Sequence, residues 1–420
     1  MIKAESELRC GLLGRKLGHS FSPLIHSFAG DYSYELFEVE PENADDFIKN
    51  GAYDCINVTI PYKENAFRCA DVLSDEAKAI GAVNTLVRRD GKIYGYNTDY
   101  FGFVALLNKN GIDPCGKNCL VLGTGGAAKM VVFALGKLNA KSITSVSRSG
   151  EINYKNVYKE CSDTEIVINT TPVGMYPEIS DSPIDISKFE QCEAVVDIIY
   201  NPSVTKLLFD AKRCGMKTAN GLYMLSAQGI KAGEFFTGRK IPDDVIDKVT
   251  DAVEQKTKNI VLIGMPGCGK SYIGSKVAEM LGREFVDIDK IIEERENRPI
   301  PTIFEKDGED YFRKIETAVT AEFCAKSGLV IATGGGVVTR EENLFPVKCN
   351  SMVCYVKRPL SNLPTDGRPL SQKTPVEVLF LQRKEKYESW SDFCIEVPCS
   401  DDGISEDVAV ECANNLIESL

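Results

Sequence analysis

The sequence predicts an α/β protein built from more than one parallel-sheet unit. Two glycine-rich loops, at residues 123–128 and 264–271, each follow a short apolar run typical of a strand and precede a pattern typical of a helix. Roughly a hundred residues of alternating short strands and helices come before the first loop. A chain of 420 residues is also too long for one ordinary hydrophobic core. We therefore expect two or three domains.

The region before the first loop is expected to form an α/β domain at 1–105. Its candidate strands are the short runs 10–13, 34–39 and 55–59. Helices within 225–252 are expected to complete this domain.

The first loop belongs to a second expected domain, 106–224, in which the strand CLVLG leads into the loop and an apolar helix pattern follows it. After the helical pattern of 225–252, the polar stretch EQKTKN indicates a linker at 253–259. The remainder, 260–420, holds the second loop and is expected to be a third α/β domain.

Composition limits the function classes. Hydrophobic content of 43% and charged content of 26% are ordinary for a soluble globular protein. The net charge of −12, with no basic run carrying interleaved aromatics, argues against nucleic acid as a partner and favours small molecules. No apolar run is long enough to cross a membrane and the start lacks a signal-peptide pattern, so we expect a cytoplasmic protein.

Cysteine usage points to a reducing compartment. The 15 cysteines are scattered, often within apolar runs, and form no CxxC pair, so reduced and mostly buried thiols are expected. Only two histidines are present, which disfavours a histidine-rich zinc site.

The second loop, GMPGCGKS, fits the pattern G-x-x-x-x-G-K-[ST] between a strand and a helix. Backbone N–H groups of Gly267, Cys268 and Gly269 can surround phosphates, assisted by the positive end of the following helix. Lys270 would meet the β- and γ-phosphates, and the Ser271 hydroxyl would ligate Mg²⁺. This pattern predicts ATP binding.

The run FVDID follows the helix of that loop and ends in two acids, Asp287 and Asp289. Residues two apart on an extended strand point to the same side. Both carboxylates are therefore expected to face the phosphate loop, one serving the metal and the other a substrate hydroxyl.

Several motifs together make the second half similar to a known family. GMPGCGKS, FVDIDKIIEER, IFEKDGEDYFRKIE, ATGGGVV, GRPL and RKEKY occur in the order and rough spacing of shikimate kinases, over about residues 258–400. The resemblance implies a P-loop fold like that of the nucleoside monophosphate kinases, with a parallel sheet.

The resemblance also implies residue roles. Asp287 would lie near Mg²⁺ through water, and Asp289 would hold the shikimate hydroxyls and act as the base for the 3-hydroxyl. Arg368 would reach the transferring phosphate from a lid. The substrate carboxylate would be held by two guanidinium groups, which suit it by geometry, and by a glycine backbone: Arg313, Arg383, Gly334, Gly335 and Gly336. Glu316 is open to a structural reading, as the partner that orients Arg313.

One stretch departs from that family. Between Arg358 and Arg368, PLSNLPTDG carries no basic residue, whereas shikimate kinases commonly have a further arginine over the adenine. Contacts from this stretch to ATP are left open.

The first loop fits the Rossmann dinucleotide-binding fingerprint, with glycines at 123 and 125 and alanine in the third place. The residues expected to contact the cofactor in it are Gly123, Gly125, Gly126 and Ala127. After the next strand, where an NAD-binding protein usually has an acidic residue, this chain has Ser147, Arg148 and Ser149. A guanidinium and hydroxyls suit a 2′-phosphate, so NADP(H) is favoured over NAD(H).

The N-terminal region carries a further anion site. Ser22-Pro23 is typical of a helix N-cap followed by proline at the first helical position. Ser20 and Ser22 would thus sit at a helix N-terminus, which favours a carboxylate.

Motifs across residues 8–250 are similar to those of shikimate dehydrogenases. They are LGHSFSPLIHS, NVTIPYK, GAVNT, GYNTD, GTGGAA, NTTPVGM, DIIYNP and NGLYMLSAQ. The resemblance implies that Lys63 and Asp99 form the catalytic pair and that Gly221 lies near the nicotinamide. It further implies a shikimate pocket lined by Ser20, Ser22, Thr59, Asn84, Tyr200 and Gln228. The family usually has asparagine where this chain has Ser147.

The chemistry is consistent with that pair. Hydride transfer to the carbonyl carbon of 3-dehydroshikimate turns its oxygen into a developing alkoxide, which a lysine ammonium held by an aspartate can stabilise and protonate.

The favoured hypothesis is that the chain runs two consecutive reactions, NADPH-dependent reduction of 3-dehydroshikimate to shikimate and ATP-dependent phosphorylation of shikimate to shikimate 3-phosphate. A second hypothesis is an NAD-linked dehydrogenase acting on quinate, against which Arg148 argues. A third is that one half is a non-catalytic binding module. Retention of Lys63, Asp99, Lys270 and Asp289 argues against that reading.

Overall fold

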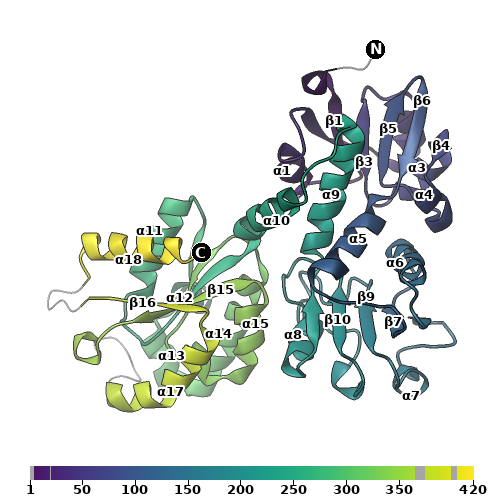
Figure 1. Cartoon of the computed structure of the whole chain (residues 1–420). Helices are drawn as coiled ribbons and strands as arrows, with labels where there is room; N and C mark the ends of the chain where they lie inside the picture. The colour runs from purple at the N-terminus through teal and green to yellow at the C-terminus, as the bar shows by residue number, and fades with distance from the viewer. Residues whose placement is uncertain (1–3, 19, 365–373, 399–403) are drawn as a thin grey trace. The chain divides into compact units, whose positions relative to one another are not determined.

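The computed structural model (Figure 1) describes residues 4–18, 20–364, 374–398 and 404–420. The chain divides into two compact units. The first unit comprises 1–173, 182–200 and 210–254, and the second comprises 174–181, 201–209 and 255–420. The first unit contains one mixed and one parallel sheet and the second unit contains one parallel sheet, all with helices packed on them, so the α/β expectation is confirmed.

The first unit begins with a six-stranded mixed sheet of spatial order β2-β1-β3-β5-β6-β4. β2, β1 and β3 run parallel, β5 and β6 form an antiparallel hairpin beside β3, and β4 pairs in parallel with β6. The strands are β1 Arg9–Gly14, β2 Ser33–Glu38, β3 Cys55–Val58, β4 Val72–Leu73, β5 Thr85–Arg89 and β6 Lys92–Tyr96. The three strands expected from the sequence are therefore confirmed within one residue at each end.

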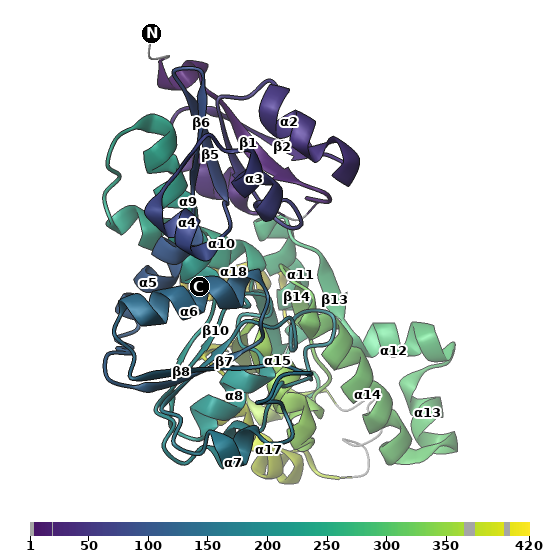
Figure 2. The ribbon, with the colours of Figure 1, turned by 90° about the vertical axis from the view of Figure 1, so that its right-hand side faces the viewer.

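Helices cover both faces of this sheet. Ile48, Ala66 and Ala77, from α2, α3 and α4, pack with strand residues such as Ile56 on one face. On the other face Phe236 of α9 packs against strand cysteines and valine. Figure 2 shows α2 and α3 beside the strands. The helices are α1 Ser22–Ser27, α2 Ala44–Asn50, α3 Lys63–Cys69, α4 Asp75–Ile80 and α9 Leu222–Thr237, with short 3₁₀ turns at Glu5–Glu7 and Pro41–Asn43.

A second, all-parallel sheet completes the first unit, with spatial order β11-β10-β9-β7-β8. β8 lies on one side of β7, and the next strand in the chain, β9, lies on its other side. The loop after β7 therefore opens at the switch point where doubly wound sheets bind ligands. α5 and α6 cover one face. The elements are α5 Thr98–Lys109, β7 Asn118–Leu122, α6 Gly126–Lys137, β8 Ser142–Val146, α7 Val157–Glu160, β9 Ile166–Asn169, the 3₁₀ turn Ile186–Lys188, β10 Ala194–Asp197 and β11 Lys217–Ala219.

Two helices of the first unit, α5 and α9, pack at very short range (Figure 1). A Cβ at Gly102 of α5 would lie 2.5 Å from the Met224 carbonyl oxygen of α9. Glycine is required there because the backbones approach too closely for any side chain.

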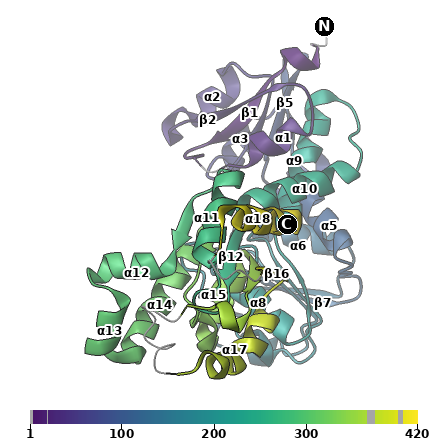
Figure 3. The same cartoon turned by 90° about the vertical axis from the view of Figure 1, so that its left-hand side faces the viewer.

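The second unit is a single parallel sheet of order β13-β14-β12-β15-β16 with helices around it. β12 lies at the centre and leads into the second glycine-rich loop. Figure 3 shows α18 running alongside α11. The elements are β12 Asn259–Ile263, α11 Lys270–Leu281, β13 Phe285–Asp287, α12 Ile288–Glu296, α13 Ile300–Lys306, α14 Gly308–Ala325, β14 Val330–Ala332, α15 Leu344–Cys349, β15 Ser351–Lys357, α17 Val376–Trp390, β16 Phe393–Glu396 and α18 Glu406–Glu418, with 3₁₀ turns at Val337–Thr339, Glu341–Asn343 and Leu360–Asn362.

Two short stretches from earlier in the chain also belong to the second unit. Ile179 and Phe209 pack in a small apolar cluster with Ala325, Phe345 and Cys349. The first half of α8, Lys206–Arg213, lies in one of these stretches. No sequence motif marks this association, because it depends on packing between residues more than a hundred positions apart.

The structure contradicts the linker expected at 253–259. Helix α10 spans Asp244–Thr257, and β12 begins at Asn259, so only Lys258 lies between them. Ile246, Val249, Val253 and Thr257 are buried at helical spacing, and this buried face carries the helix through a stretch that is otherwise polar.

The described cysteines are all free and most are buried, as expected. None of the helices in the described ranges is both long and apolar enough to cross a membrane.

Two candidate active sites

A cavity of about 540 Å³ lies within the first unit, where strand ends of the mixed sheet meet the starts of several helices. Eight of the residues predicted for the first half line it: Ser20, Ser22, Thr59, Lys63, Asn84, Asp99, Tyr200 and Gln228. Gly221 lines it as well. The structure thus brings together residues that are up to about two hundred positions apart in the chain.

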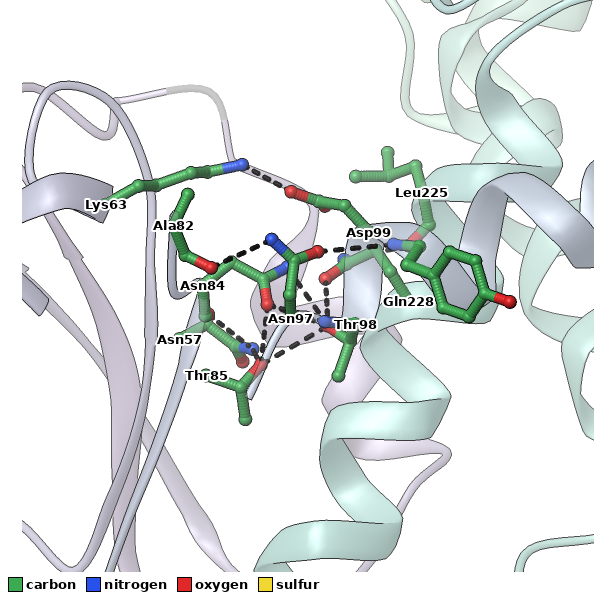
Figure 4. A network of polar contacts seen from close by, with 11 residues as sticks. Asn57, Lys63, Ala82, Asn84, Thr85, Asn97, Thr98, Asp99, Leu225 and Gln228 are labelled. Carbon is green, nitrogen blue, oxygen red and sulfur yellow. Dashed lines mark hydrogen bonds and ion pairs between the residues drawn. The ribbon is translucent and has the colours of Figure 1, made fainter. Parts of the chain in front are cut away.

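Lys63 and Asp99 form an ion pair at this cavity. Lys63 is the first residue of α3, Asp99 lies in the first turn of α5, and the Lys63 Nζ to Asp99 Oδ2 distance is 2.6 Å. Their side chains are 32% and 19% exposed, so both are held against the protein while still reaching the cavity. Figure 4 shows the two side chains pointing toward one another. An ammonium held in this way can face a substrate oxygen without losing its counter-charge.

A buried network fixes the start of α5 and, with it, Asp99 (Figure 4). The Thr98 backbone N–H donates to Asn84 Oδ1 at 2.7 Å, and Asn84 Nδ2 donates to Thr98 Oγ1 at 3.0 Å. Thr98 Oγ1 lies 3.3 Å from Gln228 Oε1, to which it donates because an amide oxygen only accepts. Asn97 caps the helix by accepting from the Tyr100 N–H. Hydrogen bonds thus orient two predicted substrate contacts, Asn84 and Gln228.

The start of α1 differs in detail from the expectation. The helix begins at Ser22, and Ser20 Oγ accepts a hydrogen bond from the Ser22 backbone N–H at 3.2 Å. Ser22 is therefore the first helical residue and not its cap. Both hydroxyls nevertheless line the cavity. His19 lies outside the described residues.

Gly221 sits where the chain turns into α9 beside the cavity. Its N–H donates to Ile199 O, and a Cβ on it would lie 2.0 Å from the Ile198 carbonyl oxygen. Tyr200, next along the chain from Ile199, packs edge-on against Phe21, and burial raises the pKa of its phenol.

The first glycine-rich loop has the form that a pyrophosphate needs. Gly123 has φ +109°, and a Cβ there would lie 2.8 Å from Thr170 Oγ1. Gly125 precedes the first residue of α6, Gly126, and added Cβ atoms at both would meet open space. A ligand can therefore approach this backbone closely. Ala127 follows in the first turn.

The 147–149 stretch follows β8, the strand next to β7, as expected. Arg148 and Ser149 are exposed and Ser147 is half-buried. A solvent-accessible guanidinium at this position fits a phosphate ligand.

In the second unit, a cavity of about 400 Å³ opens at the second glycine-rich loop. Gly267 and Gly269 have φ of +80° and +105°, which turns the loop around the cavity. Lys270, the first residue of α11, is 6% exposed, and its Nζ donates to the carbonyls of Gly264 at 2.9 Å and Met265 at 3.0 Å. Its ammonium is thus held over the loop. Cys268 is buried beneath it, and Ser271 lines the cavity.

The acids of the FVDID run do not lie together on a strand, so that expectation is wrong. β13 ends at Asp287, and Asp289 lies in the first turn of α12. Asp287 Oδ1 caps this helix by accepting from the backbone N–H groups of Asp289 and Lys290, at 3.0 and 3.3 Å. Of the two acids only Asp289 lines the cavity, which Lys270 also lines. Only the other oxygen of Asp287 is left to reach a water-held ion.

The pKa of Asp289 is strongly raised. Burial, together with the nearby carboxylates of Glu316 and Asp287, raises the pKa of Asp289 to about 7, against the lowering effect of Lys270 and Arg313. A carboxyl group with a pKa in this range is suited to accept a proton near neutral pH.

The two predicted carboxylate-binding arginines line the same cavity and are both buried. Arg313 Nη1 donates to Glu316 Oε2 at 2.6 Å, and its other nitrogens contact Glu309. Arg383 Nη1 donates to Gly335 O at 3.0 Å, and Tyr387 bonds the same carbonyl. Glu316 thus orients Arg313, which is the structural role considered for it from the sequence.

The glycines at 334–336 are required by this packing. Added Cβ atoms would lie 2.3 Å from Glu316 Oε1 at Gly334, 2.5 Å from Pro266 at Gly335 and 2.1 Å from Arg313 Nη1 at Gly336.

Among the residues that line this cavity, Glu316 and Arg383 each have one buried polar atom, Oε1 and Nε, with no hydrogen-bond partner among the described residues. Arg368 lies outside the described residues.

Comparisons with known proteins match a family to each half of the chain. The shikimate dehydrogenase substrate binding domain matches residues 12–86, and shikimate kinase matches residues 266–416. A shikimate dehydrogenase (NADP(+)) of Clostridium perfringens is 41% identical over 253 residues, 55% of this chain and 93% of that protein. The chain belongs to the shikimate dehydrogenase family. Because it also carries a shikimate kinase domain, it is a bifunctional enzyme of the shikimate pathway.

Solved structures of shikimate dehydrogenases are similar to the first unit. A chorismate mutase/shikimate 5-dehydrogenase fusion protein from Clostridium acetobutylicum has a TM-score of 0.55 and 37% identity, covering 59% of this chain and 97% of that one. The Thermus thermophilus enzyme, in complex with NADP(H) and shikimate, has a TM-score of 0.53 and 32% identity, covering 58% and 99%. The expected NADP(H), ATP and Mg²⁺ fit the two families.

Some residues at the two sites were not singled out from the sequence. Asn57 is 5% exposed and lines the dehydrogenase cavity, and Thr98 orients Asn84. Both lie inside motifs that carried the resemblance, NVTIPYK and GYNTD, so the signal was present but not resolved to single residues. In the kinase, Glu293 and Phe304 line the cavity. They lie inside the motifs FVDIDKIIEER and IFEKDGEDYFRKIE, so here too the signal was not resolved to single residues.

Gly221 gives a prediction for the dehydrogenase. Gly221→Ala would force the new Cβ against the Ile198 backbone and displace the turn into α9, so we expect dehydrogenase kcat/KM to fall about 100-fold. The kinase kcat/KM of the same preparation should not change. The matched control is Gly136→Ala in α6, where a Cβ meets open space; it should stabilise the chain by about 0.5–1 kcal/mol in thermal unfolding. Equal kinetics for the two variants would contradict this assignment.

The raised pKa of Asp289 gives a prediction for the kinase. If Asp289 must be ionised to act, kcat/KM for shikimate should rise about tenfold per pH unit up to about pH 7 and then level off. The profile is measured from about pH 5.5 to about pH 8.5 with saturating Mg-ATP. A flat profile below about pH 7 would refute a proton-accepting role with this pKa.

Proposed function

We propose that the dehydrogenase unit reduces 3-dehydroshikimate to shikimate with NADPH and that the kinase unit phosphorylates the 3-hydroxyl of shikimate with ATP. The observation that carries the proposal is that each unit gathers an acid–base group and its charged neighbour in one cavity lined by substrate-recognition residues. In the dehydrogenase these are Lys63 and Asp99, and in the kinase Asp289 and Lys270.

In the dehydrogenase, NADPH supplies the hydride to the substrate carbonyl carbon. Lys63 would donate a proton to the oxygen as negative charge develops on it, and Asp99 would hold the ammonium in position. Ser20 and Ser22 would donate to the substrate carboxylate, while Asn84 and Gln228 would bind its hydroxyl groups. The pyrophosphate would lie on the loop formed by Gly123, Gly125, Gly126 and Ala127. Arg148, with Ser147 and Ser149, would favour a 2′-phosphate.

In the kinase, ATP supplies the phosphoryl group. Asp289 would accept the proton of the 3-hydroxyl, and Arg313 and Arg383 would hold the carboxylate. Lys270 would exchange its carbonyl contacts for phosphate oxygens, next to the N–H groups of residues 267–269. Arg368 is proposed to neutralise the transferring group.

The proposed Mg²⁺ site does not consist of protein ligands alone. Among the described residues no group of three or more His, Cys, Asp or Glu side chains could hold a metal ion. Mg²⁺ typically takes only one or two protein ligands and completes its shell with phosphates and water. The Ser271 hydroxyl, with Asp287 acting through water, fits that pattern.

A coupled assay tests the proposal. The purified chain is incubated with 3-dehydroshikimate, NADPH and Mg-ATP, and shikimate 3-phosphate is measured by mass spectrometry alongside the loss of NADPH absorbance. Omitting ATP should stop the sequence at shikimate, and replacing NADPH by NADH should slow the first step. Absence of shikimate 3-phosphate would reject the two-step function. Faster turnover of quinate with NAD⁺ than of shikimate with NADP⁺ would favour the quinate alternative.

A further inference from the structure

The dehydrogenase cavity rests on an aromatic cluster that does not itself line it. Tyr34 of β2 stacks on His26 with ring centroids 4.1 Å apart and an interplanar angle of 16°. His26 stacks on Phe236 of α9 from its other side, at 5.3 Å and 17°. Its Nδ1 lies 2.6 Å from Tyr32 Oη. Stacking within this cluster leaves the Tyr34 ring little freedom to move.

His26 is a neutral member of this cluster. Burial lowers the pKa of His26 to about 3, so the imidazole is neutral near neutral pH. The cluster therefore packs as an uncharged support.

The sheet register aims the Tyr34 hydroxyl at the cavity floor. Tyr34 lies opposite Cys10, which lies opposite Cys55, and Asn57 is two residues further along the last of these strands. Residues two apart on a strand share a face, so Tyr34 and Asn57 project from the same side of the sheet. The small cysteine side chains between them leave space for the phenol. Its Oη lies 2.9 Å from Asn57 Oδ1.

The direction of this hydrogen bond follows from the other contacts of Asn57. Its Nδ2 lies 3.5 Å from the Asn84 carbonyl oxygen and 3.2 Å from Thr85 Oγ1. A carbonyl can only accept, so the amide nitrogen must lie on that side and the oxygen must face Tyr34. Tyr34 is therefore the donor. With its oxygen directed at the phenol and its nitrogen directed at Asn84 and Thr85, Asn57 is held in one amide orientation where it lines the cavity.

Burial raises the pKa of Tyr34 well above its ordinary value, and the Ser22 hydroxyl opposes only part of that rise. The phenol thus stays protonated and donates to Asn57. Ser22 and Asn57 both line the cavity, whereas Tyr34 lies behind them.

We propose that Tyr34 is a positioning residue of the dehydrogenase site, whose hydroxyl holds the Asn57 amide in the orientation with which that side chain meets the substrate. This inference rests on the proposed dehydrogenase function. Without the hydroxyl the Asn57 oxygen loses its donor, and only the contacts of the amide nitrogen still hold the side chain. The substrate then meets an amide that must reorient on binding.

The test is Tyr34→Phe, which keeps the ring and its stacking. KM for shikimate in the NADP⁺-linked oxidation should rise about tenfold, equivalent to about 1.4 kcal/mol, while kcat stays within about threefold. The kinase KM for shikimate, measured on the same protein, should not change. The matched control is Tyr53→Phe, which removes a buried hydroxyl that donates to Ile48 O in the same sheet domain.

A double-mutant cycle separates positioning from general loss of stability. If Tyr34 acts through Asn57, Tyr34→Phe should add less than about twofold to KM in an Asn57→Ala background. Additive effects, a KM unchanged by Tyr34→Phe, or equal KM changes in Tyr34→Phe and Tyr53→Phe would each overturn the inference. An inactive wild-type dehydrogenase would instead reject the proposed function, so the two failures are distinguishable.

Discussion

Lys63→Met is expected to lower the dehydrogenase kcat at least about 1,000-fold while leaving the kinase on the same chain unchanged. The substitution keeps most of the length of the side chain but removes the nitrogen that lies against Asp99 Oδ2, at 2.6 Å. The developing alkoxide then meets neither the positive charge nor the proton donor of this pair. Because Lys63 acts mainly in the transition state, KM for shikimate should change far less than kcat. Both reactions are measured by steady-state kinetics on one preparation.

A matched lysine shows whether the effect is specific. Lys231 lies in the same unit, forms an ion pair with Glu234 at 2.7 Å and is 20% exposed, close to the 32% of Lys63, but does not line the cavity. Lys231→Met should retain dehydrogenase activity within about threefold.

The partner of Lys63 offers a second check. Asp99→Asn should also be strongly impaired, and the double variant should be no worse than Lys63→Met, because residues that act as a unit are not additive. Full activity in Lys63→Met, or additive losses in the double variant, would contradict the assigned pair.

The parts of this enzyme that sequence predicted well are those set by local chemistry. A glycine-rich loop between a strand and a helix is recognisable because close phosphate approach requires glycine, as the open space at Gly125 and Gly126 illustrates. The pairing of Lys63 with Asp99 was predicted from the family motifs, because nothing local in either segment shows that α3 and α5 begin side by side.

The failures have physical causes. Asp287 and Asp289 were placed on one strand because their spacing suits one, but the Asp287 side chain caps a helix that begins at the next residue. The polar stretch before Asn259 suggested a linker, whereas the buried face of α10 extends through it. Nothing in the sequence indicated that Tyr34 supports the site, because this role depends on which residues the neighbouring strands place beside it.

The kinase site holds Asp289 in surroundings that cost stability when its carboxyl group is ionised. Asp289→Asn is expected to lower the kinase kcat at least about 100-fold, because the amide cannot accept the proton of the substrate hydroxyl. The dehydrogenase should be unaffected. Asp310→Asn is the control, since Asp310 lies in the same unit with its side chain 93% exposed.

The same substitution should stabilise the ligand-free kinase unit at about pH 8. The folded-state pKa of Asp289, about 7, lies above the unfolded value of about 3.9, so the folded state holds the proton more tightly. Stability therefore falls as pH rises from about 4 to about 7 and stays low above that range. Asparagine has no proton to lose and escapes this penalty, on the order of a few kcal/mol. Thermal unfolding should show a higher Tm for Asp289→Asn than for wild type at about pH 8 and a smaller difference at about pH 5. A gain of the same size at both pH values would show that the stabilisation comes from packing rather than from removal of a buried charge, and retained kinase activity would remove Asp289 from the proton-accepting role.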